Sequence, residues 1–178
     1  MKIFFLKDYN IWGAALGFYL NDKIDSNIVL NYLINFKSKN TLDILQVING
    51  RRIFNFTHLI IGVYKTYRAF QNKKNIAKEK SIEFLVRLCG RKNIKEAFSV
   101  VGINENVKEA ILVCCDTDLE KIKSAIFTFK KDLDITEDDC LLDFYENKLA
   151  ELKSTYNLVT NNIFYEILTR ISLIETYS

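Results

Sequence analysis

The spacing of apolar residues constrains the fold of this chain more than any other sequence feature. Short apolar runs, typical of strands, cover residues 2–6, 14–19, 45–48 and 107–115, and the segments between them carry apolar residues at helical spacing. The chain contains no proline, and no glycine-rich linker divides it. The sequence therefore predicts one domain over residues 1–178 of the α+β class. We expect several helices packed on a small, mostly antiparallel sheet, with a mixed sheet as the open alternative.

Local signals predict how these segments are connected. Residues 49–50 are Asn-Gly and separate the run 45–48 from the run 52–56, which predicts a β-hairpin. The run 2–6 is expected to pair with 14–19. Side chains that can cap or begin helices stand at four further positions: Ser26, Thr57, Thr117 and Thr136.

A helix is predicted over residues 79–89, ended by Gly90. On its outer side Glu83 precedes Arg87 by four residues, the favourable order for an ion pair. Asn93 then begins a capping box for a short helix. The last helix is expected over about 162–177. It is apolar on more than one side, which predicts either complete burial or a second face that docks a partner.

Charge is distributed unevenly along the chain. The net charge of +3 conceals +10 over residues 51–95 and −8 over residues 96–178. Aromatic residues are interleaved with the cations of the basic segment, as in grooves that bind single-stranded nucleic acid. A solvated basic face is an equally weighted alternative. The middle of the chain is therefore where an anionic partner would bind.

Catalytic chemistry is hard to assemble from these residues. His58 is the single histidine and stands at a predicted helix start, where a local hydrogen-bonding role is favoured over catalysis. No glycine-rich phosphate loop and no cysteine pair at metal-ligand spacing is present. The acidic run 132–139 is interpreted as a solvated helix start rather than a divalent-metal site. We therefore expect no enzyme activity, no cofactor and no metal.

Membrane association is not expected either. The longest apolar run, residues 11–20, is too short to span a bilayer, and Lys7 and Asp8 interrupt the apolar stretch at the N-terminus. We expect a soluble, cytoplasmic protein.

A set of spaced residues resembles the signature of a known family. His58-Leu59 is followed by Glu83-x-Leu85, Gly90-Arg91-x-x-Ile94-x-x-Ala97 and Val101-Gly102-Ile103. This pattern resembles the smallest conserved subunit of the KEOPS (EKC) complex, the family of the PRPK-binding protein TPRKB. The composition, rich in isoleucine, asparagine and lysine, suggests an archaeal-like member.

The resemblance implies an accessory role without catalysis. Family members bind the N-terminal lobe of the complex's kinase-like subunit. They also recruit tRNA, through its single-stranded 3′ CCA end, for threonylcarbamoyl-adenosine modification. We expect Ile76 to form an apolar wall for an unstacked base. The basic side chains expected to contact RNA are Arg51, Arg52, Lys65, Arg68, Lys74, Arg91 and Lys92. The side chains expected to contact the kinase-like subunit are Tyr165, Leu168, Arg170 and Leu173.

Two other functions remain open at this point. The chain could be a kinase-binding scaffold with no RNA binding of its own. It could also be a metal-dependent nuclease that uses the acids at 132, 134 and 137–139. The accessory tRNA-recruiting role is the preferred hypothesis.

Overall fold

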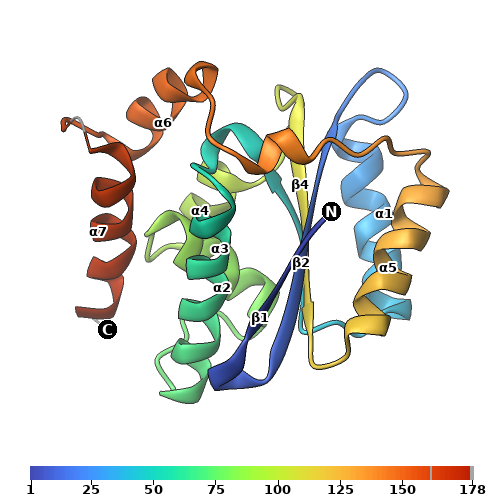
Figure 1. Ribbon diagram of the computed structural model, residues 1–178, viewed down its shortest axis with the longest axis horizontal. Coiled ribbons are helices and arrows are strands. Elements are labelled where there is room, and N and C mark those ends of the chain that lie inside the picture. The colour runs from blue at the N-terminus through green and yellow to red at the C-terminus, as the bar shows by residue number, and fades with distance from the viewer. Residues whose placement is uncertain (161, 177–178) are drawn as a thin grey trace. The chain divides into compact units, whose positions relative to one another are not determined.

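The computed structural model describes residues 1–160 and 162–176 and has the predicted α+β class (Figure 1). Its residues separate into two compact units, each assembled from two segments of the chain. The first unit contains Met1–Gly50 and Ile103–Leu142. The second contains Arg51–Gly102 and the described residues from Asp143 onward. The assignment of the whole chain to one domain stays a prediction.

The first unit is built on a four-stranded sheet in the order β1-β2-β4-β3. Each neighbouring pair is antiparallel, so the mostly antiparallel sheet is confirmed. A short 3-10 turn, Lys7–Tyr9, joins the first two strands, which pair as expected. The strands are β1 (Lys2–Leu6), β2 (Ile11–Tyr19), β3 (Ile44–Asn49) and β4 (Glu109–Asp116).

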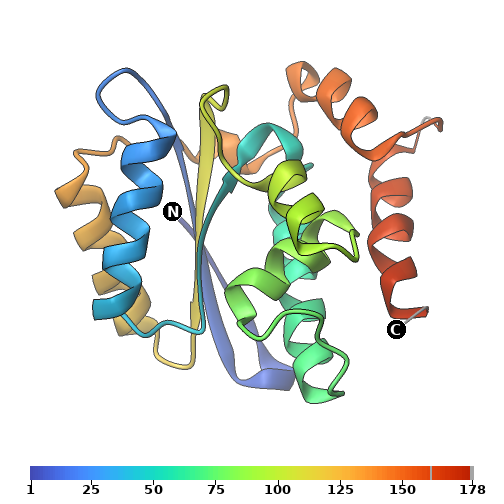
Figure 2. The same cartoon turned by 180° about the vertical axis from the view of Figure 1, so that it is seen from behind.

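Two helices, α1 (Ser26–Lys39) and α5 (Leu119–Asp132), lie side by side on one face of this sheet (Figure 2). Their apolar stripes and the facing strand residues form one buried core. Phe129 packs edge-on against Phe18, with ring centroids 5.7 Å apart. Both helices are capped by an aspartate one residue away from the side chain that the sequence suggested. Asp25 and Asp118 accept the main-chain N–H bonds, and Ser26 and Thr117 do not.

The predicted hairpin at residues 49–50 is wrong. β3 pairs with the distant β4, and the chain leaves it through a 3-10 turn, Gly50–Arg52. A local partner strand over 52–56 is not formed, because the hydrogen bonds of β3 are satisfied by a strand some sixty residues later. The helix α2 (Phe56–Gln71) then begins after Asn55, whose side chain accepts the N–H of His58 at 3.0 Å. Asn55, and not Thr57, is therefore the N-cap.

The helix predicted from Thr136 is also wrong. The main-chain N–H of Asp138 donates to the carbonyl of Gly17 at 2.8 Å, and this bond holds the segment extended along β2. Two 3-10 turns follow, Asp139–Leu142 and Glu146–Lys148, before α6 (Leu149–Tyr156) begins. The acids at the start of this segment form ion pairs: Glu137 with Lys130 at 2.6 Å, and Asp139 with the N-terminal amine at 2.6 Å.

The second unit is helical. Gly62 of α2 faces Leu88 so closely that a β-carbon at this glycine would lie 2.9 Å from the leucine side chain. Gly90 ends helix α3 (Lys80–Cys89) in the left-handed conformation, and Asn93 caps α4 (Ile94–Val101), as predicted. Tyr177, placed at the end of the last helix by sequence, lies outside the described residues. Besides α2 and α6, the helices are α3 (Lys80–Cys89), α4 (Ile94–Val101) and α7 (Ile163–Thr176).

Candidate functional site

All predicted site residues fall in the second unit, and a buried ion pair organises the loop that carries two of them. Glu83 and Arg87 of α3 pair at 2.7 Å, and their side chains are 0% and 1% exposed. The i,i+4 pairing is confirmed, but its placement on the outer side of the helix is wrong. Glu83 has further partners inside the protein, which account for its burial.

The connector, residues 72–79, supplies those partners. The second carboxylate oxygen of Glu83 accepts the main-chain N–H groups of Ile76 and Ala77 at 2.8 and 2.7 Å. Arg87 donates to the carbonyl of Lys74 at 2.6 Å. The backbone of the connector is therefore fixed by two buried charges, while the side chains of Lys74 and Ile76 are exposed.

His58 links α2 to α3. Its Nδ1 accepts the N–H of Phe54 at 3.2 Å, and its Nε2 lies 2.9 Å from the carbonyl of Leu88. The proton therefore belongs on Nε2, which donates to this carbonyl. Complete burial lowers the pKa of His58 to about 4, so the ring is neutral at pH 7. This geometry matches the local hydrogen-bonding role that the sequence favoured.

Two of the predicted RNA-contacting arginines are held by the protein itself. Arg51 and Arg52 each donate to Glu151 at 3.0 Å. Arg52 also donates to the carbonyls of Ser99 and Val100 at 2.7 and 2.5 Å. These bonds join the turn after β3 to α4 and α6, so both arginines have a structural role.

The two predicted cations on α2 differ in exposure. Lys65 is buried, with 8% of its surface exposed, whereas Arg68 is exposed near the end of the helix. Of this pair, Arg68 is therefore the one whose side chain is exposed to solvent.

A pocket of about 190 Å³ brings residues of both predicted sets together. Arg91 and Lys92 line it from the turn after α3, and Arg170 and Leu173 line it from α7. Gly90 makes this approach possible: a β-carbon there would lie 3.1 Å from the carbonyl oxygen of Arg170. The rest of the lining is Cys89, Gly90, Tyr156 and Ile174, so no carboxylate faces the pocket among the described residues.

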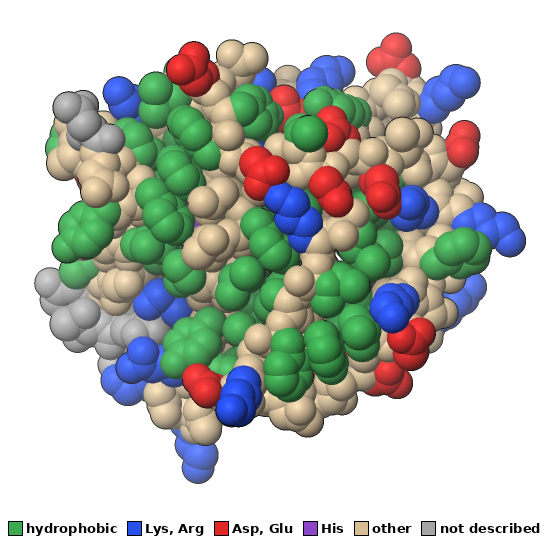
Figure 3. Space-filling view, viewed as in Figure 1, with side chains coloured by type: hydrophobic (Ala, Val, Ile, Leu, Met, Phe, Trp, Pro, Cys, Tyr) green, Lys and Arg blue, Asp and Glu red, His purple; other side chains and the backbone are tan. Residues whose placement is uncertain are grey.

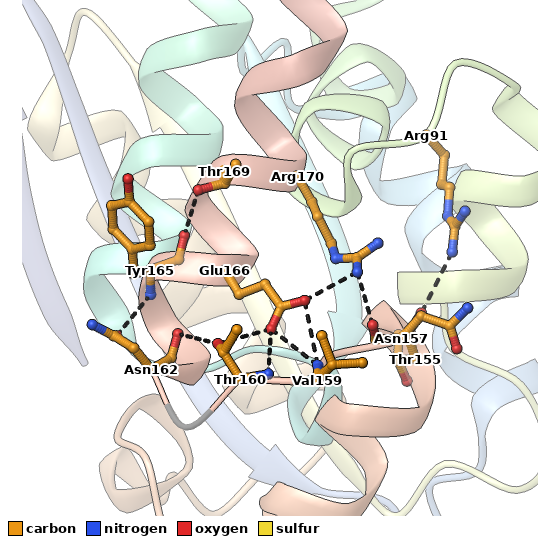
Figure 4. A network of polar contacts seen from close by, with 10 residues as sticks. All are labelled: Arg91, Thr155, Asn157, Val159, Thr160, Asn162, Tyr165, Glu166, Thr169 and Arg170. Atoms are coloured by element: carbon orange, nitrogen blue, oxygen red, sulfur yellow. Dashed lines mark hydrogen bonds and ion pairs between the residues drawn. The ribbon is translucent and has the colours of Figure 1, made fainter.

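Glu166 holds the pocket's α7 wall to the preceding loop (Figure 4). Its carboxylate accepts the main-chain N–H groups of Val159 and Thr160 at 3.1 and 3.0 Å, and the Thr160 hydroxyl at 2.9 Å. It also pairs with Arg170 at 3.1 Å. These donors, with the Thr160 N–H first, lower the pKa of Glu166 to about 2. The carboxylate is therefore charged at any physiological pH.

The outer side of α7 carries exposed apolar groups. Tyr165 is 69% exposed and Leu173 is 48% exposed, whereas Leu168 is half-buried. Figure 3 shows hydrophobic side chains at the left of the view, where Figure 1 places α6 and α7. The inner stripe of the helix, Ile163, Ile167, Ile171 and Ile174, is buried. Of the two alternatives drawn from the sequence, complete burial of this helix is therefore wrong, and α7 has an exposed apolar face.

Comparison with known proteins gives the chain a family. The family model "Kinase binding protein CGI-121" matches residues 22–175. This chain belongs to the CGI-121 family. It is also 25% identical over 134 residues to the regulatory protein Cgi121 of Methanocaldococcus jannaschii, an alignment that covers 73% of this chain and 82% of that protein. The resemblance drawn from the spaced signature is confirmed at the level of the family.

In this member of the CGI-121 family, the signature residues are largely structural. Glu83 holds the backbone of the connector, and His58 links α2 to α3. Gly90 lacks a side chain and so allows α7 to pack closely against the turn after α3. Glu166 and Arg87 were missed as site-forming residues by sequence reasoning. The available signal was the Glu-x-x-x-Arg spacing, which occurs at 83–87 and again at 166–170.

Across residues 1–160 and 162–176, no group of three or more histidine, cysteine or acidic side chains is arranged to hold a metal ion. Within the same residues, no helix combines the length and apolar character that crossing a bilayer requires.

Proposed function

We propose that this chain is a non-catalytic accessory subunit of a cytoplasmic KEOPS complex. In this role it binds the kinase-like subunit and recruits tRNA through its single-stranded 3′ CCA end. The kinase-binding part is supported by the CGI-121 family match. The RNA-binding part and the KEOPS assignment rest on the resemblance of the signature residues and on the basic surface of the second unit.

One observation carries the RNA-binding part. The connector exposes Lys74 beside Ile76, which is 38% exposed, on a backbone fixed by Glu83. A cation for phosphate and a rigid apolar wall for an unstacked base are the two components that a single-stranded RNA site needs. A flexible loop would lose conformational entropy on binding RNA, and this loss would weaken the affinity. The buried ion pair already orders the connector, so that entropy is not lost on binding.

The remaining contacts are assigned by exposure. Arg91 and Lys92 are exposed at the turn after α3, and Arg68 is exposed on α2. Lys65 is buried, and the two arginines after β3 hold Glu151. We therefore assign the phosphate contacts to Arg68, Lys74, Arg91 and Lys92.

The kinase-facing surface is assigned to α7. The exposed rings and aliphatic groups of Tyr165 and Leu173 leave an apolar face next to the half-buried Leu168. Apolar and aromatic side chains of this kind dominate the binding energy of protein interfaces. This face also favours the second candidate function, a kinase-binding scaffold that binds no RNA.

Charge reversal at Arg91 tests the RNA-binding part. Its side chain makes one long hydrogen bond, 3.4 Å to the carbonyl of Thr155, so Arg91→Glu is expected to fold. We expect tRNA affinity at low salt to fall severalfold in a filter-binding assay. The matched control is Lys153→Glu, an exposed charge reversal on α6 at a residue that does not line the pocket, which is expected to have a small effect.

Two properties of the RNA sharpen the test. Removal of the 3′ CCA should weaken binding more than changes in the anticodon loop. If about four phosphates are neutralised, log K should fall with log salt at a slope of about −3. An isolated chain that shifts no tRNA even at low salt, yet copurifies with the kinase-like subunit, would establish the scaffold alternative instead.

A further inference from the structure

The pocket between the Gly90 turn and α7 has an unbalanced charge. Three cations line it, and none of its lining residues is acidic. Arg170 pairs with Glu166, whose carboxylate lies outside the lining and already accepts three bonds from Val159 and Thr160. Two guanidinium groups and one ammonium group therefore line a small concave space to which the lining contributes no carboxylate.

Arg170 retains unused hydrogen-bonding capacity. Its Nη2 donates to Glu166 at 3.1 Å and to the carbonyl of Asn157 at 2.7 Å. Its Nε is buried without a partner in the described part of the chain. A buried donor without an acceptor is costly, and a site that accepts a ligand is one reason for its presence.

Arg91 has similar spare capacity on the opposite wall. One of its terminal nitrogens makes the long bond to Thr155, while the side chain is exposed. Figure 4 shows the guanidinium groups of Arg91 and Arg170 extending toward the same region, above Thr155 and Asn157. Two planar guanidinium groups on opposite walls suit a ligand with several acceptor oxygens.

We infer that this pocket binds a phosphate monoester. A monoester carries nearly two negative charges at pH 7 and three terminal oxygens, and it is therefore a better match for three cations than a diester or a carboxylate. The apolar wall formed by Leu173 and Ile174 would face the attached sugar or base. The volume of about 190 Å³ accommodates the phosphate and part of a nucleoside.

Two sources could supply this group: a free nucleoside monophosphate, or the 5′ end of an RNA. The RNA source rests on the proposed function, whereas the free nucleotide does not. Arg170, expected from the sequence to contact the kinase-like subunit, is here assigned to the ligand pocket instead.

The experiment uses the full chain and three pairs of probes. Calorimetry compares adenosine 5′-monophosphate with adenosine, and inorganic phosphate with chloride. Filter binding compares tRNA carrying its 5′-monophosphate with the same tRNA after phosphatase treatment. The variants are Arg91→Met and Arg170→Met, with Lys153→Met as the matched control, and thermal unfolding by circular dichroism verifies that each variant folds. Arg91→Met keeps the test valid if Arg170→Met loosens the loop at 157–160.

We expect the monophosphate to bind at least about tenfold more tightly than adenosine, because charge-assisted hydrogen bonds to the phosphate are lost in the nucleoside. Arg91→Met should lower this affinity about fivefold or more, and Lys153→Met should leave it unchanged. A loss of tRNA affinity on 5′ dephosphorylation, without binding of the free nucleotide, identifies the RNA terminus as the source. Binding of the free nucleotide, with tRNA affinity unchanged by 5′ dephosphorylation, identifies the nucleotide as the source.

The inference is overturned if neither phosphate probe binds better than its dephosphorylated counterpart, or if Arg91→Met and Lys153→Met behave alike. Undiminished tRNA binding in that case leaves the proposed function intact. Nucleotide binding without any tRNA binding has the opposite meaning: the pocket is confirmed and the RNA-recruiting function fails.

Discussion

Replacing Glu83 by glutamine removes one negative charge from the interior of the second unit with almost no change in shape. The carboxylate serves three donors with its two oxygens: Arg87, and the main-chain N–H groups of Ile76 and Ala77. Glutamine offers one oxygen and places an NH₂ group where the other oxygen stood. Either the guanidinium group or the two amides must then face a donor.

The magnitude follows from burial. Glu83 and Arg87 are 0% and 1% exposed, so water cannot replace the lost acceptor without opening the connector. Breaking a buried ion pair by removing one partner costs about 3–5 kcal/mol, since the remaining charge is uncompensated. That loss is a large part of the roughly 5–15 kcal/mol that stabilises a typical domain. The double variant Glu83→Gln with Arg87→Met should recover at least about 1 kcal/mol relative to Glu83→Gln, because no unpaired charge remains.

The assay must report on the second unit. Trp12, the single tryptophan, lies in β2 of the first unit, so its fluorescence reports elsewhere. Urea unfolding followed by far-ultraviolet circular dichroism measures the loss of all the helices, including those of the second unit. Hydrogen exchange at the Ile76 and Ala77 amides measures the connector directly and should accelerate in Glu83→Gln.

Two outcomes would refute this reasoning. The first is a loss of less than about 1 kcal/mol in Glu83→Gln, which would mean that the charge is solvated or readily replaced. The second is a double variant that is less stable than Glu83→Gln, which would mean that the pair acts through packing rather than charge compensation.

Two further predictions concern His58 and Gly90. The pKa of His58 falls from 6.5 to about 4 on folding, so below pH 6.5 the unfolded chain binds the extra proton. The contribution of His58 to the free energy of unfolding should therefore be constant above pH 6.5 and fall by about 3 kcal/mol toward pH 4. Denaturant unfolding at pH 7 and pH 4.5 should show a smaller difference in a His58→Gln variant, and an equal difference would contradict the assignment. Gly90→Ala should lower the free energy of unfolding by about 1–2 kcal/mol, since its φ is +71° and the added carbon meets α7. Gly90→Asn tolerates that φ but not the contact, so full stability in Gly90→Asn would exclude the packing contribution.

The parts of the fold that sequence predicted correctly depend on short-range signals. Gly90 ended α3 and Asn93 capped α4 because each effect acts within one helical turn. The hairpin at residues 49–50 failed for the opposite reason: the partner of β3 is β4, and no local signal at an Asn-Gly pair reveals a distant competitor. Asp138 likewise bonds to β2 where a helix start was expected.

The candidate site shows the same division. Charge counting drew attention to a basic segment that falls within the second unit, but it could not separate the buried Lys65 from the exposed Arg68. The Glu83–Arg87 pair was recognised by spacing and assigned to the wrong side of α3. The pair is buried because the main-chain N–H groups of the connector bond to Glu83. The spacing of apolar residues along α3 gives no information about these partners. Arg170 and Arg91 line the same pocket because α7 packs against Gly90, and this tertiary contact could not be predicted from local sequence.

The position of β4 between β2 and β3 has a consequence for synthesis of the chain. β3 ends at Asn49 and β4 begins at Glu109, so at 5–20 residues per second the ribosome needs about 3–12 s to supply the central strand after its neighbours are made. During that interval β2 and β3 each expose an unpaired edge of main-chain donors and acceptors. The nascent chain is therefore most prone to aggregation before Asp116 emerges, and a chain truncated at Gly102 would retain both open edges permanently.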